Sequence, residues 1–202
     1  IVVSQIVRSP GVFFAKNPLT TSFKNAKIIP KRGAWLEIET DKKGIITVKI
    51  DRKRKIPITS LLRVFGYVKD TDILNLFTDV NSNVEFDYIL NTLGKDSAKT
   101  VDEAYQQIYR KIRPGDLATP ENAKSLITSM FFDYRKYDMG AVARYKLNRR
   151  FGISTPNSKE FHVFQVPDLI LILKYLIQLN NGEKTPDDID HLSNRRIRAV
   201  GE

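Results

Sequence analysis

Hydrophobic and polar positions alternate along the first part of the chain. Residues 1–7 and 12–14 are mostly apolar and strand-like, and residues 34–40 and 46–50 show the alternation. Pro10-Gly11 marks a turn, and residues 41–44 form a hairpin loop between the last two segments. Leu36 and Ile38 lie on one face of this hairpin, and Trp35 lies on the other. The period of two predicts an antiparallel β region over about residues 1–56.

From about residue 57 the apolar positions recur at helical spacing. The first stripe consists of Ile58, Leu61, Leu62 and Phe65, and further helices are expected at 71–78, 82–93, 100–112, 119–130, 140–151 and 167–179. Thr100 followed by Glu103 is a capping-box signature, and Thr119 is an N-cap followed by proline. The expected fold class is therefore α+β, with a mostly helical body over about residues 57–199.

The excess of basic over acidic residues indicates which class of partner the protein binds. The 202 residues include 33 Lys and Arg against 23 Asp and Glu, a net charge of +10. An excess of this size favours a polyanionic partner, nucleic acid before membrane. The chain has no cysteine, which excludes disulfides and thiolate chemistry. The most apolar run, residues 169–179, is too short to span a membrane, and the length is that of one domain.

The only tryptophan lies close to a basic run in the predicted β region. Trp35 is on the polar face of the hairpin, and the run Arg52, Lys53, Arg54 and Lys55 ends the region. Another part of the chain could cover Trp35, and the run could simply be a solvated strand end. The functional interpretation is a stacking platform for a base beside a row of phosphate contacts.

The last sixteen residues, 187–202, combine acids, a histidine and arginines. This composition could place a carboxylate beside a guanidinium fork, a pair that binds a base edge or a phosphate. The alternative is a helix with acids in its first turn and bases further along. A third possibility is a Mg²⁺ site for a metal-dependent enzyme, built from Asp187, Asp188, Asp190 and His191. The arginines that follow would compete for the same carboxylates, so we predict no metal site. The sequence offers no convincing catalytic residues either.

Several long motifs resemble the β subunit of bacterial RNA polymerase and occur in the right order along nearly the whole chain. They are Ser4–Phe14, Arg32–Leu36, Ile50–Pro57, Arg113–Asp116, Arg135–Gly140, Gly140–Asn148 and Asp187–Glu202. The chain looks like the lobe of that subunit, one domain over residues 1–202 and part of a much larger polypeptide. Residues 1–14 and 187–202 would adjoin the region called the protrusion.

The resemblance implies a non-catalytic role in guiding DNA. In this family the lobe walls the main channel, contacts downstream DNA and borders the non-template strand of the transcription bubble. An unstacked guanine of that strand enters a pocket whose matching positions are Arg8, Asp190 and Arg195. An aspartate can accept from the guanine N1–H and N2–H₂ edge, and an arginine can donate to O6 or N7. Trp35 matches the residue on which the neighbouring base stacks, and Arg52 and Lys53 match basic residues near the strand.

The resemblance has further implications for ligands and partners. Val3 and Gln5 match the rim of the rifamycin pocket, although Val3 could also be a simple buried strand residue. The implied partners are DNA, the remaining β subunit, the β′, α and ω subunits and a sigma factor, in the cytoplasm at the nucleoid. The catalytic Mg²⁺ would be bound elsewhere, and no cofactor is expected in this chain.

Two departures and one rival interpretation qualify this assignment. Ser193 stands where the family usually has glycine, and the large lobe insertion of some lineages is missing between Tyr67 and Thr100. The rival is a structural or protein-interaction module without direct DNA contact.

Overall fold

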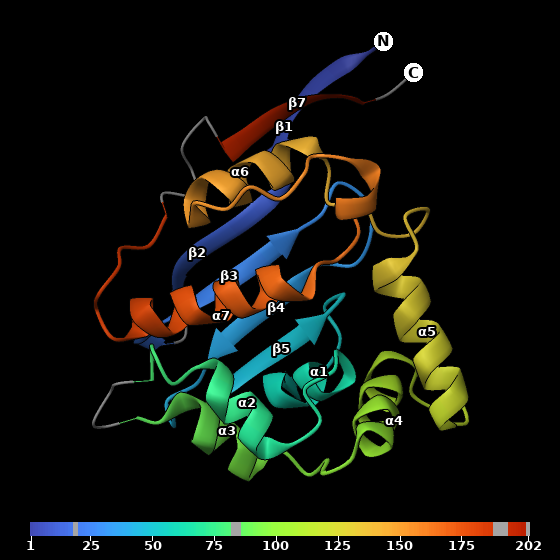
Figure 1. Cartoon of the computed structure of the whole chain (residues 1–202). Helices are drawn as coiled ribbons and strands as arrows, with labels where there is room; N and C mark the ends of the chain where they lie inside the picture. Colours follow the sequence, from blue (N-terminus) through green and yellow to red (C-terminus); the bar gives the residue numbers. More distant parts are fainter. Residues whose placement is uncertain (18–19, 82–85, 188–193, 201–202) are drawn as a thin grey trace.

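Two antiparallel sheets organise the β part of the protein (Figure 1). The structure, a computed structural model, describes residues 1–17, 20–81, 86–187 and 194–200. In this part of the chain the larger sheet has the strand order β2-β3-β4-β5-β6, and β1 pairs with β7 in a separate two-stranded ribbon. The strands are β1 (Val3–Arg8), β2 (Gly11–Asn17), β3 (Thr20–Ile29), β4 (Leu36–Thr40), β5 (Ile46–Ile50), β6 (Ile56–Pro57) and β7 (Arg195–Val200).

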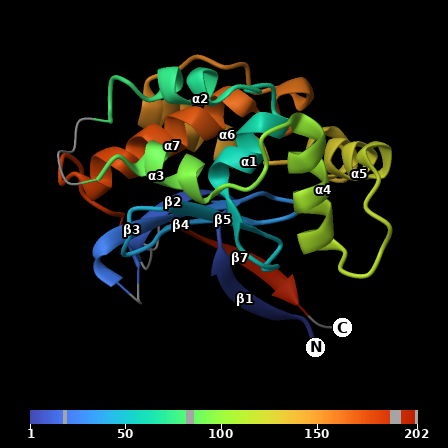
Figure 2. The same cartoon turned by 90° about the horizontal axis from the view of Figure 1, so that it is seen from below.

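The β4–β5 hairpin confirms the predicted alternation. Leu36 pairs with Ile50 and Ile38 with Val48, and all four side chains are fully buried. Asp41 fixes the hairpin loop, because its carboxylate accepts hydrogen bonds from the backbone N–H groups of residues 43 and 45 at 2.8 and 3.0 Å. The helices cover the apolar face of the sheet, as Figure 2 shows. On the opposite face, β4 and β5 carry their polar positions, whereas β2 places the buried Phe13 there.

The helices follow the predicted stripes closely. They are α1 (Ile58–Val64), α2 (Asp70–Leu76), α3 (Tyr88–Lys95), α4 (Val101–Ile112), α5 (Pro120–Phe132), α6 (Ala141–Phe151) and α7 (Val166–Asn180), with a 3-10 turn at Lys159–Phe161. The capping box at Thr100 and the N-cap at Thr119 are confirmed. Helix α3 begins later than expected, because the Asp87 side chain caps it by accepting from the Leu90 N–H at 3.0 Å.

The helix alternative for the C-terminal segment is wrong at residues 195–200. They form strand β7, not a helix or a continuation of the helical body. Each of these residues has a Cα partner on β1, from Arg8↔Arg195 to Val3↔Val200. The spacing of charges within residues 195–200 does not indicate that β1 will pair with them. This pairing with a distant strand makes the segment a strand.

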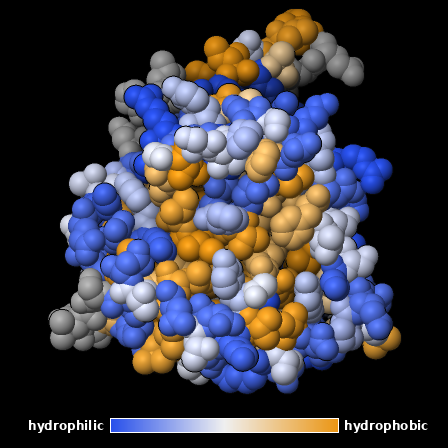
Figure 3. Space-filling model, in the orientation of Figure 1, coloured by the Kyte–Doolittle hydropathy of each residue, from blue (hydrophilic) through white to orange (hydrophobic). Residues whose placement is uncertain are grey.

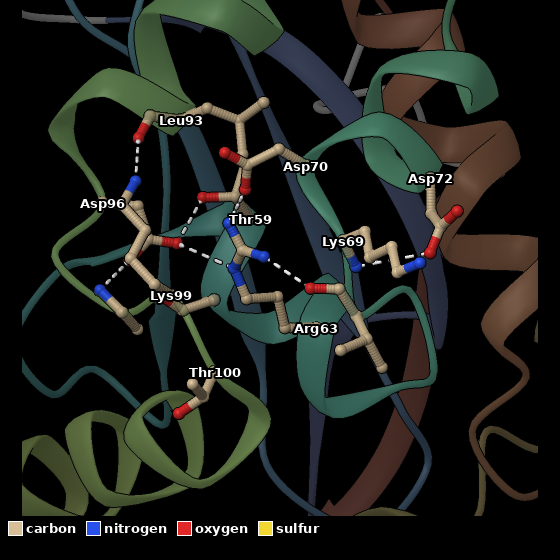
Figure 4. Close-up of polar contacts among 12 residues, drawn as sticks. Thr59, Arg63, Lys69, Asp70, Asp72, Leu93, Asp96, Lys99 and Thr100 are labelled. Atoms are coloured by element: carbon tan, nitrogen blue, oxygen red, sulfur yellow. Dashed lines mark hydrogen bonds and ion pairs between the residues drawn. The ribbon is translucent and has the colours of Figure 1, made fainter.

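A buried polar cluster joins α1 to its neighbours (Figure 4). The Asp96 carboxylate accepts from the Thr59 hydroxyl at 2.7 Å and the Ser60 hydroxyl at 2.9 Å. The fully buried Arg63 guanidinium donates to the Val68 carbonyl at 2.6 Å and also binds Asp70. The Arg63 Nε makes no hydrogen bond but lies 3.9 Å from the Asp96 carboxylate, and the other contacts pair the groups of the cluster with one another. We therefore assign the cluster a role in stabilising the helical body and no ligand.

The β1–β7 ribbon leaves large apolar side chains in solvent. Ile6 is 59% exposed and Ile197, its cross-strand partner, is 76% exposed. Hydrophobic residues are correspondingly visible where the ribbon projects at the top of Figure 3. Within the described residues, none of the helices combines the length and the apolar character needed to cross a membrane.

Candidate nucleic-acid interface

A tight turn brings the basic run against Trp35. The Lys53 N–H donates to the Ile50 carbonyl at 3.0 Å, and the Asp51 N–H donates to the Trp35 carbonyl at 2.9 Å. Asp51 and Arg52 both have positive φ, 51° and 60°. This is the pattern of a type I′ turn, in which glycine, asparagine and aspartate predominate. Aspartate tolerates positive φ better than arginine does, so the two hydrogen bonds hold the turn in a conformation that Arg52 in particular disfavours.

The turn places one cation of the run on the tryptophan. The Arg52 guanidinium carbon lies 5.3 Å from the centroid of the half-buried Trp35 ring. A cation–π contact at such a site contributes about 0.5–1 kcal/mol. Base stacking at Trp35 stays a prediction, but the ring already binds a planar, positively charged group.

The four basic residues of the run have different surroundings. All four are exposed, and Lys55 forms an ion pair with Glu39 at 2.8 Å. Lys49 approaches the same carboxylate at 3.5 Å. Burial raises the pKa of Glu39, but the hydrogen bonds and charges of the two lysines outweigh that effect and hold the pKa below its usual value. The charge of Lys55 is thus partly neutralised by Glu39. Lys53 and Arg54 follow the turn and are exposed.

The structure brings two of the three predicted pocket residues together. Arg8 and Arg195 are cross-strand partners at the end of the ribbon nearest the body. The Ser9 N–H donates to the Asn194 carbonyl at 3.0 Å, and Lys146 on α6 donates to the Ser9 hydroxyl at 3.2 Å. The third residue, Asp190, lies outside the described residues, as do His191 and Ser193.

Asp187 contributes to the fold, which bears on the metal-site alternative. Its carboxylate accepts from the Phe14 N–H at 2.9 Å and from the Arg150 guanidinium at 2.8 and 2.9 Å. It therefore ties the segment before residue 188 to β2 and α6. In the part of the chain that the structure describes, no group of three or more potential ligands is placed to hold a metal ion.

The predicted rim residues of the rifamycin pocket lie on the ribbon. Val3 is 58% exposed, so the interpretation of Val3 as a simple buried strand residue is wrong for this structure. Gln5 is also exposed and is paired with Arg198. Their part in drug binding stays a prediction.

The ribbon and the basic turn lie on the same side of the larger sheet. Figure 2 shows the helices on one face of that sheet, and both the ribbon and the turn between β5 and β6 on the opposite side. Strands β1 and β7 and the turn between β5 and β6 thus border one side that the helices leave uncovered.

A cleft beside the turn was missed by the sequence interpretation. Its volume is about 360 Å³, and its lining consists of Gly33, Ala34, Asp51, Arg113, Leu126, Ser129, Met130 and Lys136. Arg113 and Lys136 belong to two of the motifs that carried the family resemblance. The presence of Arg113 and Lys136 in these motifs was the only sequence signal that could have pointed to the cleft. The pattern of apolar positions did not indicate that the two motifs lie close together in the fold.

Comparisons with known proteins match this chain to one family. The model described as RNA polymerase Rpb2, domain 2, matches residues 8–198. The DNA-directed RNA polymerase subunit beta of Dehalococcoides mccartyi (strain CBDB1) is 47% identical over 206 residues, which cover 100% of this chain and 16% of that protein. The corresponding subunit of Chloroflexus aggregans is 42% identical over 233 residues, with 100% and 19% covered. That of Syntrophomonas wolfei is 43% identical over 208 residues, with 100% and 18% covered. The chain thus spans less than a fifth of the length of these relatives.

Proposed function

From the premise that the chain belongs to the RNA polymerase β-subunit family, we propose that it is the lobe of that subunit and guides DNA without taking part in catalysis. It lines the main channel, contacts downstream DNA and borders the non-template strand of the transcription bubble. Arg8 and Arg195, together with Asp190, bind an unstacked guanine, and Trp35 stacks on the neighbouring base.

One observation carries this proposal. The Arg8–Arg195 pair belongs to the β1–β7 ribbon and the Trp35–Arg52 contact to the turn between β5 and β6, and the ribbon and the turn lie on the side of the larger sheet that the helices leave uncovered. A single strand that follows this side could meet an aromatic ring and a pair of guanidinium groups. Base stacking supplies sequence-tolerant affinity, and guanidinium donors supply base recognition.

The proposal includes the assembly around the lobe. DNA, the rest of β, the β′, α and ω subunits and a sigma factor are its partners, in the cytoplasm at the nucleoid. The catalytic Mg²⁺ of the whole polymerase is held by residues outside this chain. Val3 and Gln5 border the rifamycin pocket.

A second candidate function is a protein-interaction module. The exposed apolar pair Ile6 and Ile197 favours it, because an isolated two-stranded ribbon is only marginally stable in water. A protein surface packed on the ribbon would serve this module without any contact to DNA.

The decisive experiment changes Trp35 in the assembled polymerase. We expect Trp35→Ala to weaken binding of fork DNA by about 1–3 kcal/mol, or roughly 5- to 150-fold, and Trp35→Phe to retain much of the affinity. Binding is measured by equilibrium titration with DNAs that differ only in the non-template base. Equal affinity of all three proteins for every DNA would contradict the proposal and favour the protein-interaction module.

A further inference from the structure

The cleft beside the turn lies directly next to the proposed strand contacts. Ala34 in its wall precedes Trp35 in the chain, and Asp51 in its wall precedes Arg52. Helices α4 and α5 close its other side through Arg113, Leu126 and Met130. The cleft wall therefore includes the two residues that directly precede Trp35 and Arg52 in the chain.

Gly33 shapes this wall. Its φ is +121°, and a Cβ atom placed there would lie 2.9 Å from the Lys136 carbonyl oxygen. Only glycine allows the backbone to approach residues 136–137 so closely in this conformation. The antiparallel bridge between Arg32 and Asp138 fixes the same approach. The cleft is thus set by backbone contacts and does not depend on mobile side chains alone.

The lining separates apolar groups from charged groups. Ala34, Leu126 and Met130 are half-buried and supply the apolar surface. Arg113 and Lys136 are exposed cations in the same lining. The Lys136 ammonium donates to the Ser129 hydroxyl, which holds it at the cleft and leaves further N–H donors for a ligand.

We propose that this cleft binds one nucleotide of a single-stranded nucleic acid. The base lies against Ala34, Leu126 and Met130, and Arg113 and Lys136 bind the phosphate. This inference rests on the proposed function, because it extends the path of the same strand by one position. It adds a base-binding site that is separate from the guanine pocket and from Trp35.

The single acid in the cleft gives the nucleotide an orientation. The Asp51 carboxylate repels phosphate, so the phosphate binds at the cations, and the carboxylate can accept from an amino or imino N–H of the base. A volume of about 360 Å³ lies in the range of ligand pockets, roughly 300–1,000 Å³. A base with an exposed N–H donor is therefore preferred.

The test measures fork-DNA binding by the assembled polymerase over a range of salt concentrations. Arg113→Gln and Lys136→Gln should each weaken binding and lower the log–log salt slope by about 0.7, the value for one phosphate contact on a single strand. Arg110→Gln is the matched control, since Arg110 is an exposed arginine one turn earlier on α4 and does not line the cleft. Its slope should equal that of the parent enzyme.

A second measurement tests the base. An abasic site is moved along the non-template strand on both sides of the nucleotide at Trp35. One adjacent position should weaken binding to the parent enzyme but have a smaller effect on Met130→Ala, which removes part of the apolar surface. Parent-like slopes in both charge variants would overturn the inference, as would insensitivity to the abasic site at every adjacent position.

The two proposals fail in different ways. If Trp35→Ala weakens binding and the cleft variants do not, the strand passes Trp35 but not the cleft, and only this inference is wrong. If the cleft variants weaken binding and Trp35→Ala does not, the nucleotide site in the cleft is supported and the proposed stacking of a base on Trp35 is wrong.

Discussion

Arg8 and Arg195, from opposite ends of the chain, are cross-strand partners at the base of the β1–β7 ribbon. Directly paired residues of an antiparallel ribbon point to the same face, and like charges in such a pair destabilise it. An acceptor that binds both guanidinium groups would offset part of this repulsion, in addition to the interaction that Arg195 makes within the protein. A guanine base, with O6 and N7 on one edge, is such an acceptor.

The first prediction concerns base preference at this pair. In the assembled polymerase, Arg195→Ala should weaken the preference for guanine at the pocket position by about 1–3 kcal/mol, or roughly 5- to 150-fold, without abolishing nucleotide addition. The measurement compares binding of fork DNAs with each of the four bases at that position. Arg196→Ala is the control, because Arg196 pairs with Val7 on the opposite face of the ribbon. An unchanged preference in Arg195→Ala would remove this residue from the pocket.

A second prediction tests the strain in the turn at Asp51. Asp51→Gly should raise the free energy of unfolding by up to about 1 kcal/mol, because glycine adopts positive φ without steric cost. Asp51→Val should lower it by about 1–2 kcal/mol, because a β-branched residue is disfavoured there. Denaturant unfolding of the chain gives both values. Lys53→Val in the same exposed segment should change stability by less than about 0.5 kcal/mol, and an equal loss in both valine variants would mean that φ is not the cause.

The hairpin and the helix caps could be predicted from the sequence because local patterns determine them. The alternation at Leu36 and Ile38 places side chains on a buried face wherever the strand lies in the sheet. Thr100 caps α4 through groups three residues away. Neither feature depends on a distant partner.

The features that escaped prediction depend on distant partners. Strand β7 is a strand because of β1, and the cleft forms because Arg113 and Lys136 meet the loop before β4. The sequence also predicted a helix at 140–151 but gave no sign that Arg144 in it would be fully buried. Its partner, Asp168 on α7, has no fixed spacing from it in sequence. Composition could suggest the chemistry of the interface, whereas only the fold shows which charges remain at the surface.

The third prediction concerns this buried ion pair. The Arg144 guanidinium donates to both carboxylate oxygens of Asp168, at 2.5 and 3.0 Å. Asp168→Ala should destabilise the protein by about 3–5 kcal/mol, because it leaves a buried guanidinium uncompensated. The double variant Arg144→Met with Asp168→Leu should be much less destabilised, since no buried charge remains. Denaturant unfolding of the single and double variants tests this, and a double variant no more stable than Asp168→Ala would contradict the argument.

The fourth prediction concerns the acid side of the stability profile. Because the pKa of Glu39 is lower in the folded protein than its ordinary value of 4.5, the unfolded chain binds more protons at this site. The stabilisation is therefore complete above pH 4.5 and is lost as the pH falls through the folded pKa. Hydrogen bonds from Arg63, the Lys99 backbone and Arg135 likewise lower the pKa of Asp70, Glu103 and Asp133.

Unfolding free energy measured between neutral pH and about pH 3 checks this sign. Glu39→Gln should lower stability at neutral pH and make the decline toward acid shallower, without removing it, because the other three carboxyl groups still titrate. Lys55→Gln should act in the same direction with a smaller effect, since Lys49 remains 3.5 Å from the Glu39 carboxylate. A decline as steep in Glu39→Gln as in the parent would mean that the lysines do not stabilise the charged form of Glu39. Lys55 would then be free of this ion pair and could contribute its whole charge to a nucleic-acid phosphate.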